Sequence, residues 1–226
     1  MSIIADNIKR IKSELPESVQ LIAVSKTHPA EAIVEAYNAG QRIFGENKVQ
    51  ELTEKYENLK DYIDIKWHLI GHLQTNKVKY IAPFVDMIHS VDSLKLLSEI
   101  NKQALKNSRI INCLLQFHIA SEDTKFGLNL DEVKFLLDSE EYKCLKNVNI
   151  CGVMGMATFS DNMELIRSEF KKLHEIFTYL KKNYYIANNS FKDISMGMSS
   201  DWKIAIEEGS TLIRVGSDIF GYRNYM

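Results

Sequence analysis

One lysine stands directly after an apolar run close to the amino terminus of the chain. Residues 20–25 read QLIAVS, Lys26 follows, and Pro29 comes three positions later, where the first turn of a helix accepts a proline. A lysine amine whose pKa is lowered by apolar and cationic surroundings adds to an aldehyde to form a Schiff base. A lone lysine after a strand is also a common surface or ion-paired residue, so Lys26 by itself indicates no function.

Small and hydroxyl-bearing residues near the carboxyl terminus have the chemistry of an anion site. Ser199 and Ser200 follow the apolar run 193–198 and precede a segment with helical periodicity. Gly216 and Ser217 follow the last apolar run, and their small side chains let backbone N–H groups approach a phosphate closely. Hydroxyl and N–H groups at the start of a helix are typical anion ligands. Ordinary turns and helix caps explain each stretch alone equally well.

The elements that must position these residues alternate along the chain. Short apolar runs predict strands at 20–25, 42–45, 66–71, 85–91, 110–119, 149–156, 193–198 and 212–216. Helical periodicity occurs between them at 29–39, 47–60, 74–81, 93–106, 130–138, 162–182 and 201–208, and also at the amino terminus. Apolar strands alternating with amphipathic helices predict an α/β fold with a parallel sheet covered by helices.

The number of repeats favours a closed sheet. Eight strand–helix repeats in 226 residues favour a (β/α)8 TIM barrel with an extra N-terminal helix over an open doubly wound sheet. We expect one domain over residues 1–226, because no linker rich in glycine, serine and proline interrupts the pattern. The polar segment 118–132 is predicted to be a long loop beside the site.

A barrel would bring the ends of all its strands to one rim, where active sites of this fold lie. Polar residues follow the predicted strands and would gather there: Ser25, Lys26, Glu46, Asn47, His68, His72, His89, Ser90, His118, Ser199, Ser200, Arg214, Gly216 and Ser217. Phosphate sites in barrels usually lie in the loops after the last two strands, which here contain the two serine and glycine stretches. A lysine that binds aldehydes, opposite a phosphate site, suggests pyridoxal 5′-phosphate (PLP).

Motifs along the chain carry a family resemblance. In order, they are AVSKTHP, FGENKVQE, WHLIGHLQTNK, HSVDS, SMGMSSD and IRVGSDIFGYR, and they extend over nearly the whole chain. On these motifs the sequence resembles the pyridoxal phosphate homeostasis proteins, which are single-domain relatives of the barrel domain of alanine racemase. The resemblance implies a TIM barrel with PLP as its cofactor.

The resemblance also implies roles for individual residues. Lys26 would hold PLP as a Schiff base, Asn47 would lie beside the pyridine ring near its phenolic oxygen, and Arg214 would point its guanidinium at the pyridine nitrogen. His28 stands where relatives often have a basic residue, and we assign it no role.

The phosphate would be held by the carboxyl-terminal loops in this family. The resemblance implies that Ser199, Gly216 and Ser217 bind it, with Ser200 as a further contact. Many relatives have threonine where this chain has Ser217, but the backbone N–H donor is the same.

Arg214 predicts a holding protein rather than an enzyme. PLP stabilises carbanions best when its ring nitrogen is protonated, and an arginine, which only donates hydrogen bonds, requires that nitrogen to stay neutral. The resemblance places the second acid or base of the racemases on a separate carboxyl-terminal domain, which we expect to be missing here. We therefore expect a protein that holds PLP and releases it to amino acids or to PLP-requiring apo-enzymes, without robust catalytic turnover.

Two enzymatic functions stay open from the sequence. In an amino-acid racemase that depends on PLP, His68, His72, His89 or Tyr222 would supply the missing proton donor. In an aldolase acting on a phosphorylated sugar, Lys26 would form its Schiff base without a cofactor.

Composition excludes several other classes. Lys and Arg total 28 against 30 Asp and Glu, so the chain lacks the excess of basic residues that is typical of nucleic-acid-binding proteins. No apolar window approaches the length of about 18 residues that a membrane helix needs. Cysteines at positions 113, 144 and 151 form no C-x-x-C pair, which favours reduced thiols in the cytoplasm. The spacing of His68 and His72 would suit a metal ion only if both residues were on a helix, so we expect no metal site. We also expect the protein to be a monomer.

Overall fold

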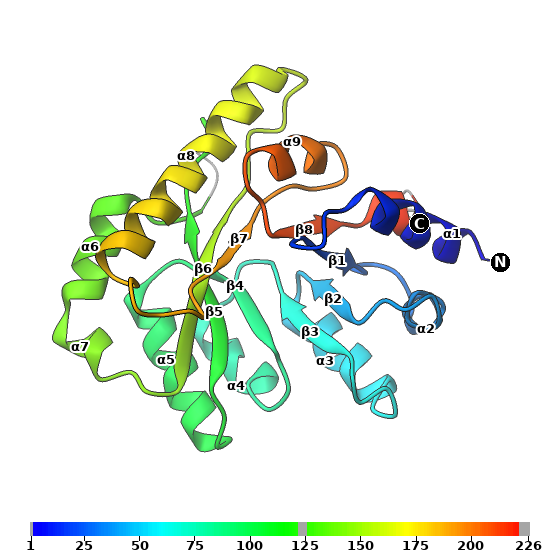
Figure 1. Ribbon diagram of the computed structural model, residues 1–226. Helices are drawn as coiled ribbons and strands as arrows, with labels where there is room; N and C mark the ends of the chain where they lie inside the picture. Colours follow the sequence, from blue (N-terminus) through cyan, green and yellow to red (C-terminus); the bar gives the residue numbers. More distant parts are fainter. Residues whose placement is uncertain (1, 122–125, 222–226) are drawn as a thin grey trace.

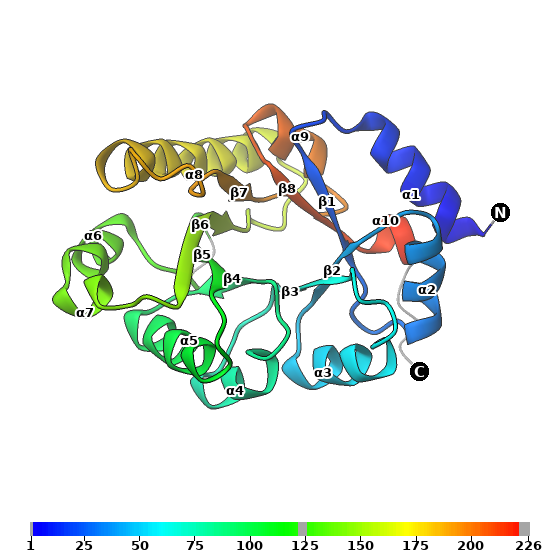
Figure 2. The same ribbon diagram turned by 60° about the horizontal axis from the view of Figure 1, so that its bottom comes forward.

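The computed structural model describes residues 2–121 and 126–221, and within them eight parallel strands form a closed barrel in the order β1-β2-β3-β4-β5-β6-β7-β8 (Figures 1 and 2). The strands are β1 Gln20–Val24, β2 Ile43–Glu46, β3 Lys66–Leu69, β4 Met87–Val91, β5 Ile111–Phe117, β6 Val148–Gly155, β7 Asp193–Ser195 and β8 Leu212–Val215. β1 pairs with β2 on one side and with β8 on the other, which closes the sheet. The predicted TIM barrel is confirmed.

Helices surround the barrel on the outside (Figure 2). They are α1 Ile3–Glu14, α2 Ala30–Asn38, α3 Val49–Asn58, the 3-10 helix η1 Thr75–Lys77, α4 Val78–Ile81, α5 Leu94–Lys106, α6 Leu130–Asp138, α7 Glu140–Lys143, α8 Met163–Asn183, α9 Trp202–Glu207 and α10 Ser217–Phe220. The predicted extra helix is α1, which lies beside α2 and α10, and its Asn7 donates a hydrogen bond to the carbonyl of Ile219 in α10 (Figure 1).

Side-chain caps explain where several helices begin. The side chains of Ser2, Ser93 and Asn162 accept hydrogen bonds from the first-turn backbone N–H groups of α1, α5 and α8. Asn129 and Glu132 form a reciprocal capping box at the start of α6. Each cap satisfies a backbone donor that has no acceptor within its own helix.

The barrel has a core on each side of its wall, because successive side chains of a strand point to opposite faces. On β8, Ile213 and Val215 pack outward against the helices, while Leu212 points inward. The apolar part of the interior is formed by Ile22, Met87, Leu114, Cys151, Met154 and Leu212. The remaining inward positions on β3, β4, β7 and β8 are polar, and they reappear below.

Most predicted elements agree with those observed to within two residues at each end, and two differ further. The predicted helix 74–81 is a 3-10 turn followed by the short helix α4. The predicted strand 193–198 ends at Ser195, because Gly197 adopts a φ of +93° and turns the chain toward α9. A Cβ atom at Gly197 would lie 2.6 Å from the Cβ of Ala205, so this close approach requires glycine. Helices α7 and α10 were not predicted, because four residues are too few to show a period.

None of the helices among the described residues combines the length and the apolar character that crossing a bilayer requires.

The backbone contact at Gly152 gives a test of the barrel wall. A Cβ at this position of β6 would lie 1.8 Å from the carbonyl oxygen of Asp193 in β7. We expect Gly152→Ala to lower the free energy of unfolding by about 2–4 kcal/mol, through overpacking and backbone strain, in urea unfolding experiments.

Gly40→Ala is the matched control. Gly40 also has a positive φ, +86°, but a Cβ there would meet no atom within 4 Å. We expect it to lose only about 1–2 kcal/mol from the left-handed conformation. Equal losses in the two variants would show that the contact between β6 and β7 is not tight.

Candidate cofactor site

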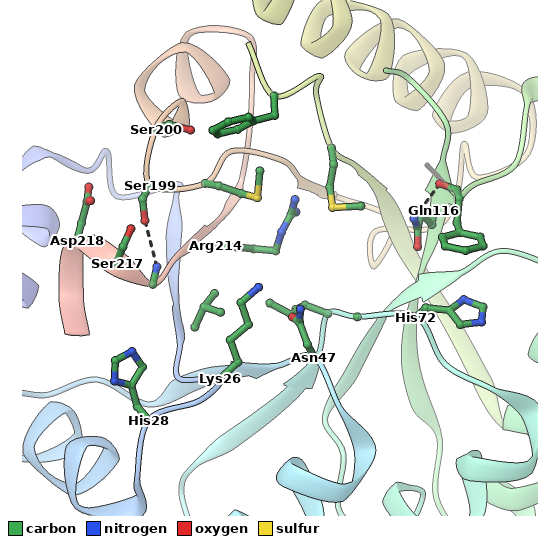
Figure 3. A pocket seen from close by; sticks show the side chains of 18 of the residues that line it. Lys26, His28, Asn47, His72, Gln116, Ser199, Ser200, Arg214, Ser217 and Asp218 are labelled. Carbon is green, nitrogen blue, oxygen red and sulfur yellow. Dashed lines mark hydrogen bonds between the residues drawn. The ribbon is translucent and has the colours of Figure 1, made fainter. Parts of the chain in front are cut away.

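A pocket of about 740 Å³ opens at the carboxyl ends of the strands (Figure 3). All residues predicted to contact a cofactor line it: Lys26, Asn47, Ser199, Ser200, Arg214, Gly216 and Ser217. They come from the ends of β1, β2, β7 and β8, which the closed barrel places around one opening. The structure brings the predicted set together, and the role of each residue stays a prediction.

Lys26 lies two residues beyond the end of β1, at a turn. Ser25 before it is buried, and Thr27 after it has a φ of +68°, a left-handed conformation that is uncommon for a threonine. The partly buried side chain of Lys26 extends into the pocket toward Asn47 and Arg214 (Figure 3). The turn at Lys26 therefore needs support from outside the strand.

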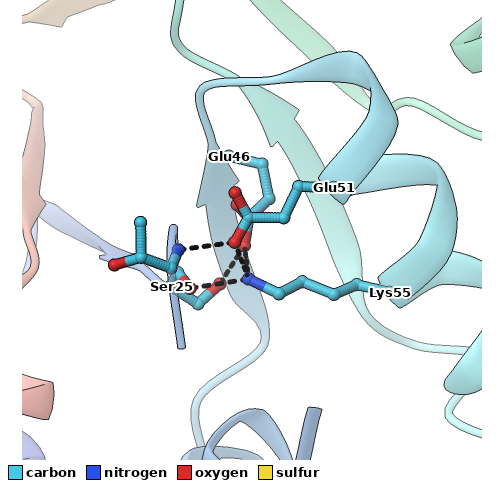
Figure 4. A network of polar contacts seen from close by, with 5 residues as sticks. Ser25, Glu46, Glu51 and Lys55 are labelled. Atoms are coloured by element: carbon cyan, nitrogen blue, oxygen red, sulfur yellow. Dashed lines mark hydrogen bonds and ion pairs between the residues drawn. The ribbon is translucent and has the colours of Figure 1, made fainter. Parts of the chain in front are cut away.

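That support comes from a buried charged cluster between β1, β2 and α3 (Figure 4). The Lys55 ammonium donates hydrogen bonds to the Ser25 carbonyl at 2.6 Å and to the carboxylates of Glu46 and Glu51, each at 2.7 Å. The Ser25 hydroxyl donates to Glu46 at 2.6 Å, and the Thr27 N–H donates to Glu51 at 2.5 Å. Both residues that flank Lys26 are thus tied to one ammonium group on α3.

Burial makes this cluster energetically demanding. The side chains of Lys55 and Glu46 are 7% and 0% exposed. Burial raises the pKa of Glu46, although Lys55 and Ser25 act in the opposite direction. Its second carboxylate oxygen, Oε2, has no hydrogen-bond partner among the described residues. A buried pair of this kind becomes strongly destabilising when one partner is removed, because the other charge is left uncompensated.

The loops after β7 and β8 meet on the opposite side of the pocket. The Gly216 N–H donates to the Ser199 hydroxyl at 3.3 Å, which joins the two loops. The Met198 N–H donates to Asp201 at 2.5 Å, so Asp201 closes the serine-bearing loop just before α9. A Cβ at Gly216 would lie 3.1 Å from the carbonyl oxygen of Val24, which explains glycine at this position. The Gly216 N–H, predicted as a phosphate donor, thus already has an acceptor.

The two remaining phosphate-site candidates are more open to solvent. Ser199 is half-buried, whereas Ser200 and Ser217 are exposed. Ser217 is the first residue of α10, and Asp218 beside it also lines the pocket.

Arg214 forms the inner end of the pocket. It is buried inside the barrel and donates to the Ser195 hydroxyl at 2.5 Å and to the Gly155 carbonyl at 3.1 Å. Burial lowers the pKa of Arg214 to about 10, while the charge of Asp201 acts in the opposite direction. The guanidinium is therefore still protonated at neutral pH.

Two predicted rim histidines are not at the rim. His68 and His89 lie inside the barrel below the pocket, because each occupies an inward position of its strand and neither is a terminal residue. The sequence predicted the strands that contain these histidines correctly, but it did not show how deep their side chains lie in the barrel. His72 does line the pocket, where it lies 3.3 Å from Asp92 and stacks on Phe126. Tyr222 lies outside the described residues.

Several pocket residues were not singled out from the sequence. Gly71 packs closely against the backbone of Asn47. A Cβ at this position would lie 2.4 Å from the Asn47 carbonyl oxygen, so the contact requires glycine. Buried Gln116 donates to the carbonyl of Phe126 at 2.9 Å, and Phe126, which belongs to the predicted loop 118–132, lines the pocket. Residues 122–125 of that loop lie outside the described residues. The glycine in LIGH, at a strand end, was the signal available for Gly71.

Among residues 2–121 and 126–221, no group of three or more His, Cys, Asp or Glu side chains is placed to hold a metal ion. His68 and His72 have separate partners and do not converge on one point.

Comparisons with known proteins agree with this geometry. A family model described as alanine racemase, N-terminal domain, matches residues 1–224. The pyridoxal phosphate homeostasis protein of Aquifex aeolicus is 44% identical over 207 residues, which is 91% of this chain and 88% of the relative. The chain belongs to the pyridoxal phosphate homeostasis protein family. The human member is 38% identical, over 91% of this chain and 77% of its own length.

Solved structures show the same barrel. PipY of Synechococcus elongatus PCC7942, solved with PLP bound, is 39% identical with a TM-score of 0.87, covering 96% of this chain and all of PipY. Alanine racemase from E. faecalis has a TM-score of 0.72 at 18% identity, with 98% of this chain matching 58% of the racemase, which shows a shared fold.

Removing the Lys55 ammonium tests the charged cluster. We expect Lys55→Met to lower the free energy of unfolding by about 3–5 kcal/mol, because Glu46 would keep a buried charge without its cation. Urea unfolding measures the loss, and the double variant Lys55→Met/Glu46→Gln should recover part of it.

Lys60→Met is the control, because Lys60 pairs with Glu57 on the surface beyond α3. Its free energy of unfolding should stay close to that of the unchanged protein, because an ion pair in solvent contributes little to stability. A loss in Lys55→Met no larger than that in Lys60→Met would contradict a supporting role for the cluster.

Proposed function

We propose that this protein binds PLP in the barrel pocket, holds it as a Schiff base on Lys26 and releases it, and so serves intracellular PLP homeostasis without robust catalytic turnover. The observation that carries the proposal is that Lys26, Arg214 and the loops after β7 and β8 line different sides of one pocket. The PLP-bound structure of PipY, a relative with 39% identity, supports the choice of cofactor.

The residues present fit the aldehyde end of PLP. The Lys26 amine would hold the cofactor through its aldehyde carbon by a C=N bond, with the carbonyl oxygen leaving as water that carries the two protons of the neutral amine. Val24, Ile70 and Met156 line the pocket with apolar groups that exclude water from this bond. Asn47, whose backbone packs closely against Gly71, lines the pocket, and its side-chain amide would be available to the phenolic oxygen of the ring.

The phosphate end fits the opposite loops. Ser199 and Ser217 offer hydroxyl groups, and Ser200 is a third hydroxyl on the same side of the pocket. A phosphate at this place would compete with the Ser199 hydroxyl for the Gly216 N–H. On binding, a charged phosphate oxygen would replace the neutral hydroxyl as the acceptor of this hydrogen bond.

Arg214 supports holding over turnover. When bound, PLP supplies an electron sink whose strength depends on protonation of the ring nitrogen. The protonated Arg214 guanidinium only donates hydrogen bonds, so it stabilises the ring nitrogen as a neutral acceptor. Lys26 and Arg214 therefore favour a stored aldehyde over a stabilised carbanion.

Release requires an amine or an acceptor protein. We propose amino acids and PLP-requiring apo-enzymes as recipients, and the cytoplasm as the compartment, which agrees with three free cysteines of which Cys113 and Cys151 are buried. We further propose that one chain suffices as a monomer, since the predicted contacts lie on one chain.

A PLP-dependent amino-acid racemase is the alternative, and one observation favours it. His72 lines the pocket and is the histidine among those considered as proton donors that reaches it. Racemisation of alanine that depends on both Lys26 and His72 would support this alternative and contradict a holding function.

Replacing Lys26 tests the covalent link. After incubation with PLP and reduction with borohydride, the unchanged protein should carry a pyridoxyl group on the peptide that contains Lys26, detected by mass spectrometry. Lys26→Ala should carry none there, and the Lys60→Met control should be labelled like the unchanged protein. Labelling of Lys26→Ala to the same extent would refute the proposal.

Replacing Ser199 tests the phosphate contact. We expect Ser199→Ala to bind PLP more weakly by about 1 kcal/mol, or by up to about 3 kcal/mol if the hydrogen bond is charge-assisted. Titration with unphosphorylated pyridoxal provides the control, because its affinity should be the same for both proteins. An equal loss for both ligands would show that Ser199 does not contact the phosphate.

A further inference from the structure

A chain of polar contacts runs through the barrel interior and ends on Arg214. The Arg214 guanidinium donates to the Ser195 hydroxyl at 2.5 Å, and Ser195 lies 2.9 Å from Nδ1 of His89. Nε2 of His89 lies 2.9 Å from Nδ1 of His68, and Nε2 of His68 lies 3.5 Å from the Asp86 carboxylate. We call Asp86, His68, His89, Ser195 and Arg214 the interior chain.

The interior chain crosses the barrel from one end to the other. His68, His89, Ser195 and Arg214 come from β3, β4, β7 and β8, at inward-facing positions. Asp86 stands just before β4, at the end of the barrel opposite the pocket, and its side chain is 39% exposed. The chain therefore links the inner end of the pocket to the far end of the barrel.

The two ends determine which atoms carry protons. Arg214 can only donate, so Ser195 accepts from it and has its one proton left for Nδ1 of His89. His89 then carries its proton on Nε2 and donates to His68. His68 carries its own proton on Nε2, facing the Asp86 carboxylate, which can only accept.

The opposite direction is unfavourable. A neutral His68 that donated from Nδ1 would turn the lone pair of Nε2 toward the negative charge of Asp86. The terminal carboxylate therefore selects the Nε2–H form of both rings.

Burial and the surrounding charges agree with two neutral rings. Burial lowers the pKa of His68, and Asp86 acts in the opposite direction. Burial also lowers the pKa of His89 well below its usual value, and so do Arg214 and, whenever it is protonated, His68. Contact with His68 lowers the pKa of Asp86, where Lys66 and Arg109 are the other charges nearby.

We propose that His89 and His68 are positioning residues for Arg214, which keep the Ser195 hydroxyl as an acceptor and so hold the guanidinium at the inner end of the pocket. This inference rests on the proposed function in so far as Arg214 faces the ring of PLP. Groups that never touch the cofactor, as far away as Asp86, would then influence the state of the ring nitrogen.

The first test needs no cofactor. Side-chain ¹⁵N–¹H correlation NMR of the PLP-free protein at neutral pH should show His68 and His89 as neutral rings with the proton on Nε2. In Asp86→Asn the amide can accept or donate, so a second tautomer of His68 should become populated. A proton on Nδ1 of either ring in the unchanged protein, or identical tautomers in Asp86→Asn, would overturn the proposal.

The second test uses the PLP-loaded protein. Ser195→Ala removes the link between His89 and Arg214 with little change in volume, and it should shift the absorbance maximum of bound PLP and weaken PLP binding roughly five- to tenfold, the scale of one net hydrogen bond. Met154→Leu is the matched interior control, because Met154 is buried in the apolar part of the barrel and outside the interior chain. It should change neither quantity.

The outcomes separate the two proposals. Absence of PLP binding in the unchanged protein, with the expected tautomers, would refute the proposed function and leave the interior chain standing. Normal binding on Lys26 with an unshifted spectrum in Ser195→Ala would refute the positioning role and leave the proposed function standing. Variants that lose folded structure are recognised by NMR, and His89→Gln, which keeps polar groups at that position, then replaces Ser195→Ala and should show the same spectral shift.

Discussion

The parallel pairing of β1 with β8 is the constraint on which the rest of the structure depends. Its register sets Ile22 opposite Arg214 and Ala23 opposite Val215. The residues that follow these strands, Lys26 and Gly216, are therefore brought to one opening although they come from the two ends of the chain. Parallel strands all point the same way, so closing the sheet collects every strand end at this opening.

The barrel wall carries polar groups on both of its faces near the site. Outside it, the Lys55 ammonium ties down the backbone on either side of Lys26. Inside it, the Ser195 hydroxyl and two histidines extend from Arg214 toward Asp86. Buried polar groups of this kind are destabilising unless they are hydrogen-bonded, so their presence here is better explained by the demands of a site than by those of packing.

In the proposed function, Arg214 connects this architecture to the choice between storage and catalysis. A carboxylate at the same place would favour a protonated ring nitrogen, whereas a guanidinium favours a neutral one. The alanine racemase from E. faecalis shares the barrel at 18% identity, and a shared fold by itself does not indicate a shared activity. The function thus depends on which residues the barrel presents at its opening.

The sequence by itself determined the order of the elements and the residues at the strand ends. Apolar runs that alternate with amphipathic segments are recognised from local periodicity. The same periodicity places Lys26 and Gly216 just after strands, and Ser199 in the loop that follows β7. Resemblance to a family, rather than periodicity, indicated the roles of Asn47 and Arg214. These features could be predicted because each is encoded within a few neighbouring residues.

Only the tertiary structure decided how deep a side chain lies and which distant group it contacts. His68 and His89 were predicted at the rim, but strand register and barrel closure place them inside, in contact with each other. The contact of Lys55 with Ser25 likewise joins residues on α3 and after β1. No local pattern encodes such contacts, because they arise only when segments far apart in sequence pack against one another.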